Sequence, residues 1–119
     1  MAPASRRARL TGAGAFEAVF RRGQRSDGDF VQLVSMPAAR ASGRVGFVIG
    51  RKVLPRAVDR NRVRRMLRVV VRERSPAIDD LDLIVRVKRP VARGEFSQVV
   101  AEARRMLSGL PVISARREA

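Results

Sequence analysis

A segment that holds seven arginines, residues 60–74, constrains the fold of this chain more than any other part of the sequence. Pro55 precedes the segment and Ser75-Pro76 follows it, and prolines at these positions favour helix boundaries. In an α-helix over about 56–74, four apolar side chains fall on one stripe: Val63, Met66, Leu67 and Val70. The arginines occupy the remaining surface, so the helix must pack one side against a core and present a cationic side outward.

The charge of the whole chain favours a polyanionic partner. Its 119 residues carry 26 Lys and Arg against 11 Asp and Glu, which gives a net charge of +15. All the cations except Lys52 and Lys88 are arginines, and either genomic base composition or selection for forked phosphate contacts would explain this bias. A solvated helix face is the alternative to nucleic-acid binding. Glu73 is the only carboxylate among residues 60–74 that could relieve the repulsion, so the sequence favours nucleic acid.

The residue types that are absent limit the chemistry of this chain. It has no cysteine and no histidine, which excludes disulfides, Cys-ligated metals and the commonest general base. Asp79, Asp80 and Asp82 form the only close carboxylate cluster, and they follow Pro76, where Asp commonly forms turns. A turn is favoured there over a metal site, so we expect no catalytic residue and no metal bound by the protein.

No segment predicts a membrane span or export. No apolar run approaches the ~20 residues that a bilayer requires. The arginines near the N-terminus have no apolar segment behind them, unlike those of a secretory signal. We therefore expect a cytoplasmic protein, and its 45% hydrophobic residues suffice for one folded core.

Periodicity predicts one small α+β domain over residues 11–110, between a flexible basic segment 1–10 and a flexible tail 111–119. Helices are expected at about 12–22, 56–74 and 95–108. Strands are expected at 29–36, 44–50 and 81–87, with an extra short strand near 24–28. Such an order predicts a sheet packed with three helices.

Phenylalanines are the only aromatic residues, and two of them are open between a structural and a binding role. Phe16 and Phe20 share one face of the first helix, where either the core or a nucleic-acid site could claim them. Phe47 lies on the predicted core face of its strand. On the other face of that strand stand Gly46 and Gly50, which leave it flat enough for a close approach to the backbone.

The segment from Ala57 to Arg68, which reads AVDRNRVRRMLR, resembles the RNR motif of the protein subunit of bacterial ribonuclease P. Three further segments are similar to that family: the F..VF..G pattern from Phe16 to Gly23, the glycine-containing strand and basic turn from Val45 to Lys52, and the strand from Leu81 to Val85. The resemblance implies the family's α+β fold, shared with ribosomal protein domain-2-like proteins. That fold has a mixed sheet, three helices and a left-handed βαβ crossover, although right-handed crossovers are the rule.

The resemblance also implies a function. Ribonuclease P is an endoribonuclease that removes the 5′ leader of precursor tRNA during tRNA processing. In this family the RNA subunit carries out the catalysis with bound Mg²⁺, and the protein assists by binding the RNA subunit and the leader. The expected partners are therefore the ribonuclease P RNA and precursor tRNA, with no membrane contact and no protein partner inferred.

Residues carried over from the family form two expected sites. Contact with the RNA subunit is expected at Arg51, Lys52, Arg60, Asn61, Arg62, Arg64, Arg65 and Arg68. The leader is expected in a cleft lined by Phe16, Phe20, Val31 and Leu33, and Leu33 stands where some members carry an aromatic residue. A ribosomal protein or general RNA chaperone without a role in cleavage is the alternative. A metal-dependent nuclease that uses Asp79, Asp80 and Asp82 ranks third.

Overall fold

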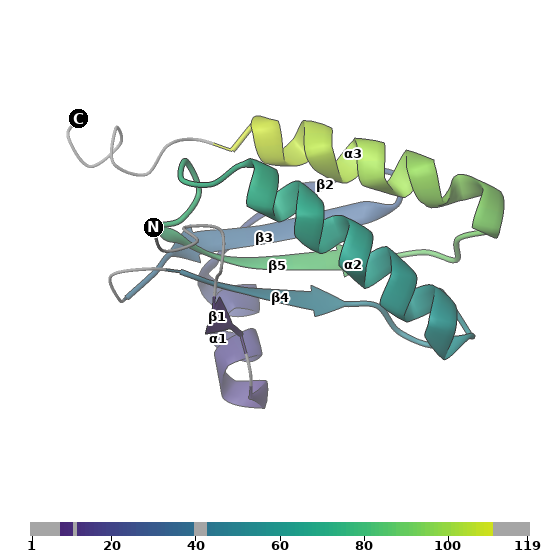
Figure 1. The fold of residues 1–119 in the computed structure, drawn as a ribbon. Coiled ribbons are helices and arrows are strands. Elements are labelled where there is room, and N and C mark those ends of the chain that lie inside the picture. Colours follow the sequence, from purple (N-terminus) through teal and green to yellow (C-terminus); the bar gives the residue numbers. More distant parts are fainter. Residues whose placement is uncertain (1–7, 11, 40–42, 111–119) are drawn as a thin grey trace.

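The fold is built on one five-stranded mixed sheet (Figure 1). The computed structural model describes residues 8–10, 12–39 and 43–110. The strand bounds are β1 Ala8–Arg9, β2 Gln24–Asp27, β3 Val31–Pro37, β4 Arg44–Val48 and β5 Leu81–Val87. Across the sheet the strands are ordered β1-β4-β5-β3-β2. β3 pairs antiparallel with β2 and β5, whereas β4 pairs parallel with β1 and β5.

Three α-helices of the described residues cover the two faces of this sheet. They are α1 (Ala13–Arg22), α2 (Ala57–Glu73) and α3 (Phe96–Ser108), and a short 3₁₀ helix, η1 (Arg93–Glu95), leads into α3. α2 and α3 pack together on one face, and α1 packs on the other. None of these helices combines the length and the apolar character that a membrane span requires. The expected α+β architecture is confirmed.

The connection from β4 through α2 to β5 is the left-handed crossover that the family resemblance implied. β4 and β5 are parallel neighbours. In Figure 1 both strands run to the right, β5 lies above β4, and α2 returns to the left in front of the sheet. A path that leaves β4, crosses in front and enters the strand above turns left-handed, against the usual rule.

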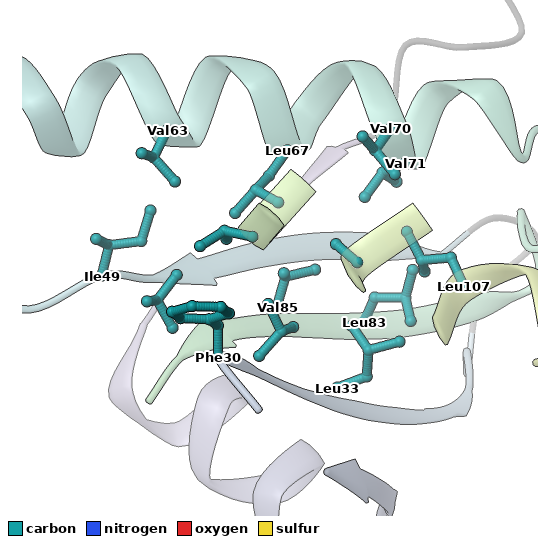
Figure 2. Close-up of a cluster of buried hydrophobic side chains, with 14 of the residues drawn as sticks. Phe30, Leu33, Ile49, Val63, Leu67, Val70, Val71, Leu83, Val85 and Leu107 are labelled. Atoms are coloured by element: carbon teal, nitrogen blue, oxygen red, sulfur yellow. The ribbon is translucent and has the colours of Figure 1, made fainter. Parts of the chain in front are cut away.

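The larger core lies between α2, α3 and the sheet (Figure 2). α2 buries Val63, Leu67, Val70 and Val71. These side chains meet sheet residues such as Leu83 and Val85, together with Leu107 of α3. A fully buried side chain of this size contributes roughly 1.5–3 kcal/mol. The predicted stripe is confirmed except at Met66, which is only partly buried at the margin of the cluster while Val71 is buried.

A smaller core fixes α1 on the opposite face of the sheet. Its buried members are Leu10, Val19, Val34 and Ile84. The ring of Phe16 lies directly on Gly46, because a Cβ added to that glycine would come within 2.5 Å of the ring. The glycine therefore admits a close approach, as predicted, and the group that approaches is the ring of Phe16.

Residues 8–10 belong to the fold, which corrects the prediction of a flexible segment over 1–10. Ala8 and Arg9 pair with Arg44 and Val45 of β4. Leu10 donates its N–H to the carbonyl oxygen of Val45 at 2.9 Å and is 2% exposed. The many arginines of this segment indicated a flexible lead-in, but Leu10 is an apolar residue that holds the segment in the smaller core. The predictions for residues 1–7 and 111–119 lie outside the described residues.

A buried carboxylate joins α3 to the turn between β2 and β3. Glu102 is 6% exposed. Its Oε1 accepts hydrogen bonds from the N–H groups of Phe30 and Val31 at 2.7 and 2.8 Å, and its Oε2 accepts one from the N–H of Asp29 at 2.7 Å. Gly28 leaves room for the carboxylate, since a Cβ there would come within 2.5 Å of it. The side chain supplies the acceptors that these backbone groups lack within the sheet.

Replacing Glu102 with Ala should therefore lower the free energy of unfolding by about 2–4 kcal/mol, because it leaves buried N–H groups without an acceptor. Glu102→Gln should cost less, since its amide oxygen can still accept from Phe30 and Val31. Urea unfolding measures both changes. Gln98→Ala, at an exposed position of the same helix, is the control. A loss for Glu102→Ala no larger than that of the control would contradict the assigned role.

Candidate nucleic-acid interface

The outer surface of α2 carries a row of cationic side chains. Because Val63, Leu67 and Val70 face the core, the period of 3.6 residues places positions 61, 65, 68 and 72 on the opposite side of the helix, with position 62 at the edge of that side. The exposed polar residues of this surface are Asn61, Arg62, Arg65, Arg68 and Arg72. The turn that follows β4 adds Arg51 and Lys52, which are also exposed. These residues together are called the α2 cationic surface.

Carboxylate partners are unevenly distributed around α2. Arg104 of α3 lies 3.0 Å from Glu73, and Arg93 of η1 lies 3.5 Å from Asp59 in the first turn of α2. Within the described part of the chain, no side-chain hydrogen bond or ion pair is made by Arg51, Lys52, Arg62, Arg65 or Arg72. Charged groups at this density without counter-charges favour binding of an external polyanion.

Two of the predicted RNA-contacting arginines hold the protein's own backbone or side chains. Arg60 donates from Nη1 to the carbonyl oxygens of Leu54 and Pro55, each at 2.9 Å. It thereby closes the turn that leads into α2. Arg64 donates from Nη1 to Oδ1 of Asn61 at 2.8 Å, one turn earlier on the helix. Both arginines are half-buried, and they flank the α2 cationic surface rather than belong to it.

Arg68 stands apart because it lies over an aromatic ring. Its Cζ is 5.4 Å from the centroid of the Phe47 ring, within the range of a cation–π interaction. Phe47 is on β4 and packs against the larger core while part of its surface stays exposed. The predicted core position of Phe47 is therefore confirmed, and the ring has a further neighbour in the α2 cationic surface.

A second candidate surface lies on the face of the sheet that α1 partly covers. Four residues form one row across it, because Val48 is paired with Arg86, Arg86 with Gln32, and Gln32 with Asp27. Alternation places this row on the same face as Val34 and Ile84, which lie in the core beneath α1. Phe16 and Phe20 pack against that same small core and stay partly exposed. The row and these two rings are called the α1-side surface.

Hydrogen bonds fix the polar side chains of this row. Arg86 donates to Oε1 of Gln32 at 3.1 Å, and Nε2 of Gln32 donates to Oδ1 of Asp27 at 3.1 Å. Lys88 donates to the same oxygen of Asp27 at 3.2 Å. This bond from Lys88 is the main cause that lowers the pKa of Asp27 from its ordinary value, and the bond from Gln32 adds to it while desolvation opposes it. The row thus presents an amide of fixed orientation beside a guanidinium.

The predicted leader cleft must be corrected on its strand side. Val31 and Leu33 are 0% and 1% exposed, and both belong to the larger core beneath α2 and α3. Figure 2 shows Leu33 within that cluster. Phe16 and Phe20 lie on the opposite face of the sheet, so the four predicted residues cannot line one cleft. The physical reason is the two-residue alternation of β3, which places Gln32 on the α1 side.

Sequence reasoning missed Gln32, Val48 and Arg86 as members of a surface, although a signal for them was present. Gly46 marks the face of β4 that a helix approaches closely, and Val48 follows it on the same face. Gly46 thus identifies the face of β4 that lies toward α1. Val48 is on that face and is paired with Arg86 of β5, so Arg86 lies on the same face.

The three clustered aspartates have structural contacts of their own. The carboxylate of Asp79 accepts from the hydroxyl of Ser75 at 3.0 Å. Asp82 is 4% exposed and accepts from the N–H and the guanidinium of Arg44 at 2.8 and 3.3 Å. The backbone carbonyl of Asp80 accepts from the N–H of Ala38 at 2.8 Å. The predicted turn before a strand is confirmed for Asp79 and Asp80, whereas Asp82 lies within β5.

Comparison with known proteins gives one consistent result. The family model described as Ribonuclease P matches residues 4–110. The ribonuclease P protein component of Chromobacterium violaceum is 33% identical over 102 residues, which cover 86% of this chain and 84% of that protein. The ribonuclease P protein component of Acidothermus cellulolyticus is 38% identical over 107 residues, which cover 87% of this chain and 88% of that protein.

Solved structures show the same fold at lower identity. The RNase P protein of Staphylococcus aureus superposes with a TM-score of 0.69 and 17% identity, over 93% of this chain and 96% of that one. The RNase P protein of Thermotoga maritima, solved in complex with 1-(4-fluorophenyl)-2-thiourea, gives a TM-score of 0.66 and 19% identity, over 81% of this chain and 94% of that one.

The contacts of the arginines predict a division between those that hold the fold and those that are free to bind. Arg60→Ala should lower the free energy of unfolding by about 1–2 kcal/mol, because two carbonyl oxygens lose a charged donor. Arg65→Ala should change it by less than about 0.5 kcal/mol, because Arg65 is exposed. Urea unfolding distinguishes the two variants, and equal losses would contradict the division.

Proposed function

Because the chain belongs to the ribonuclease P protein family, it is a protein subunit of ribonuclease P, and we propose that its α2 cationic surface binds the RNA subunit of that enzyme in the cytoplasm. The observation that carries the proposal is the absence of counter-charges around these exposed arginines within the described residues. Phosphate oxygens of an RNA backbone would supply the missing acceptors, and a guanidinium can bind two of them at once.

The spacing of the arginines fits an extended RNA backbone better than a single phosphate. Arg62, Arg65 and Arg72 recur at intervals of three and seven residues, which keeps them on one side of α2. At 1.5 Å per residue, Arg62 and Arg72 are separated by about 15 Å along the helix axis. Arg60 and Arg64 flank this row, and we assign them the role of holding the helix start and Asn61 in place.

We assign the cleavage step of the enzyme to the RNA subunit and to Mg²⁺ held by that RNA. The composition supports this assignment, because the chain has neither histidine nor cysteine. Asp79 and Asp82 contribute their carboxylates to contacts within the fold. In this assignment the substrate of the assembled enzyme is precursor tRNA. The protein raises the affinity for this substrate and helps to position it.

For the 5′ leader of precursor tRNA we propose contact with the α1-side surface. A single strand is commonly bound by aromatic side chains that stack on bases and by cations that contact phosphates. Phe16 and Phe20 supply partly exposed rings there, and Arg86 supplies a guanidinium. The paired row crosses β2, β3, β5 and β4, so it extends over about 14 Å at the usual spacing of strands.

Substituting Arg65 with Ala should weaken binding of the ribonuclease P RNA and reduce the slope of log affinity against log salt by about one, as for a single phosphate contact. Titration at several salt concentrations measures both quantities. Arg104→Ala, which removes an arginine already paired with Glu73, is the matched control and should leave the slope unchanged. If Arg65→Ala changes neither affinity nor slope, this surface does not bind the RNA.

Substituting Phe20 with Ala should reduce the preference of the assembled enzyme for precursor over mature tRNA by more than it reduces affinity for the RNA subunit. The physical reason is the loss of a stacking ring, which by alanine substitution costs about 1–3 kcal/mol per base. Binding of both tRNA forms to the assembled enzyme measures the preference. Leu33→Val, a conservative change in the opposite core, is the control and should alter stability without altering the preference. Equal losses of RNA affinity and of leader preference would assign Phe20 to the core alone.

A further inference from the structure

The interaction between Arg68 and Phe47 differs from the other contacts of arginine in the described residues. Phe47 lies on β4, two residues beyond Val45, which is the last β4 residue paired with β1 among the described residues. The ring packs against the larger core on one side, and the guanidinium of Arg68 lies 5.4 Å from its centroid. A rigid strand thus presents an aromatic ring to a side chain of the cationic helix.

The contact restrains Arg68 without consuming its hydrogen-bond donors. Within the part of the chain that the structure describes, the guanidinium of Arg68 makes no hydrogen bond and no ion pair. Arg89 provides the contrast, because it lies 4.0 Å from the centroid of the Phe30 ring and also donates to the backbone and the carboxylate of Asp29. Arg68 therefore keeps its N–H groups for an external acceptor, whereas Arg89 uses Nε and Nη2 within the fold.

We propose that Phe47 is a positioning residue for RNA binding, which holds the guanidinium of Arg68 where a phosphate of the RNA subunit can accept from it. This inference rests on the proposed function of the α2 cationic surface. An arginine side chain loses rotamer freedom when it binds, and a ring that restrains it beforehand reduces that loss. An exposed cation–π interaction corresponds to a change in affinity of about two- to fivefold.

The test lowers the electron density on the face of the Phe47 ring while nearly keeping the ring's shape. Site-specific incorporation of para-fluorophenylalanine and pentafluorophenylalanine at position 47 withdraws electron density from the ring face in two steps. We expect affinity for the ribonuclease P RNA to fall in the same order, by about two- to fivefold for the fully fluorinated ring. Urea unfolding of each protein confirms that the domain is folded at the temperature of the binding assay.

The same two replacements in an Arg68→Met background separate positioning from packing. Methionine keeps a long apolar side chain over the ring but has no charge, so fluorination should leave RNA affinity unchanged in that background. An equal loss in both backgrounds, or no loss in either, would overturn the proposal. If Arg68→Met binds the RNA as tightly as the wild-type protein, the positioning role is also overturned. The proposed RNA-binding function would then still be decided by Arg65→Ala.

Discussion

The packing of one side of α2 against the sheet is the constraint on which the rest of the structure depends. Val63, Leu67, Val70 and Val71 bury the apolar side of the helix. A helix that is fixed in this way has no freedom to turn its arginines inward, so their mutual repulsion is directed toward solvent. The energy of apolar burial thus maintains a concentration of positive charge that an isolated helix of this composition would disfavour.

The two faces of the sheet carry different kinds of side chain, because successive residues of a strand point to opposite faces. One face carries the larger core and, beyond it, the helix with the cationic side. The other face carries α1 and the polar row that Arg86 and Gln32 share. A single strand contributes to both, since Phe47 contacts Arg68 while its neighbour Val48 lies in the row on the far face. Neighbouring residues of one strand therefore belong to the two candidate surfaces on opposite faces of the sheet.

Helices and strands could be predicted from the sequence where their apolar residues recur at a regular period. Residues of the candidate site could be predicted only where they lie on such a helix or strand. β5 was placed without error because Leu81, Leu83, Val85 and Val87 alternate. The outward position of the exposed arginines of α2 could be predicted from the helical period of 3.6 residues. The face of β3 could not be chosen from its own residues, because apolar side chains stand on both faces of the strand, Val31 and Leu33 on one and Val34 and Met36 on the other. The role of Glu102 depends on backbone groups 71 to 73 residues away, which no local pattern contains. Arg60 reaches Leu54 and Pro55 only because the turn before α2 brings their carbonyl groups beside it.

The last strand of the described residues, β5, is the central strand of the sheet. β5 lies between β3 and β4, and these two strands do not pair with each other. During synthesis, β3 and β4 therefore leave the ribosome without a shared partner, and the sheet can close only when residues 81–87 are available. A chain that stops before Leu81 has no continuous sheet on which the cationic helix could be seated. The α2 cationic surface therefore gains its seat on the sheet only after residues 81–87 have joined β4 to β3.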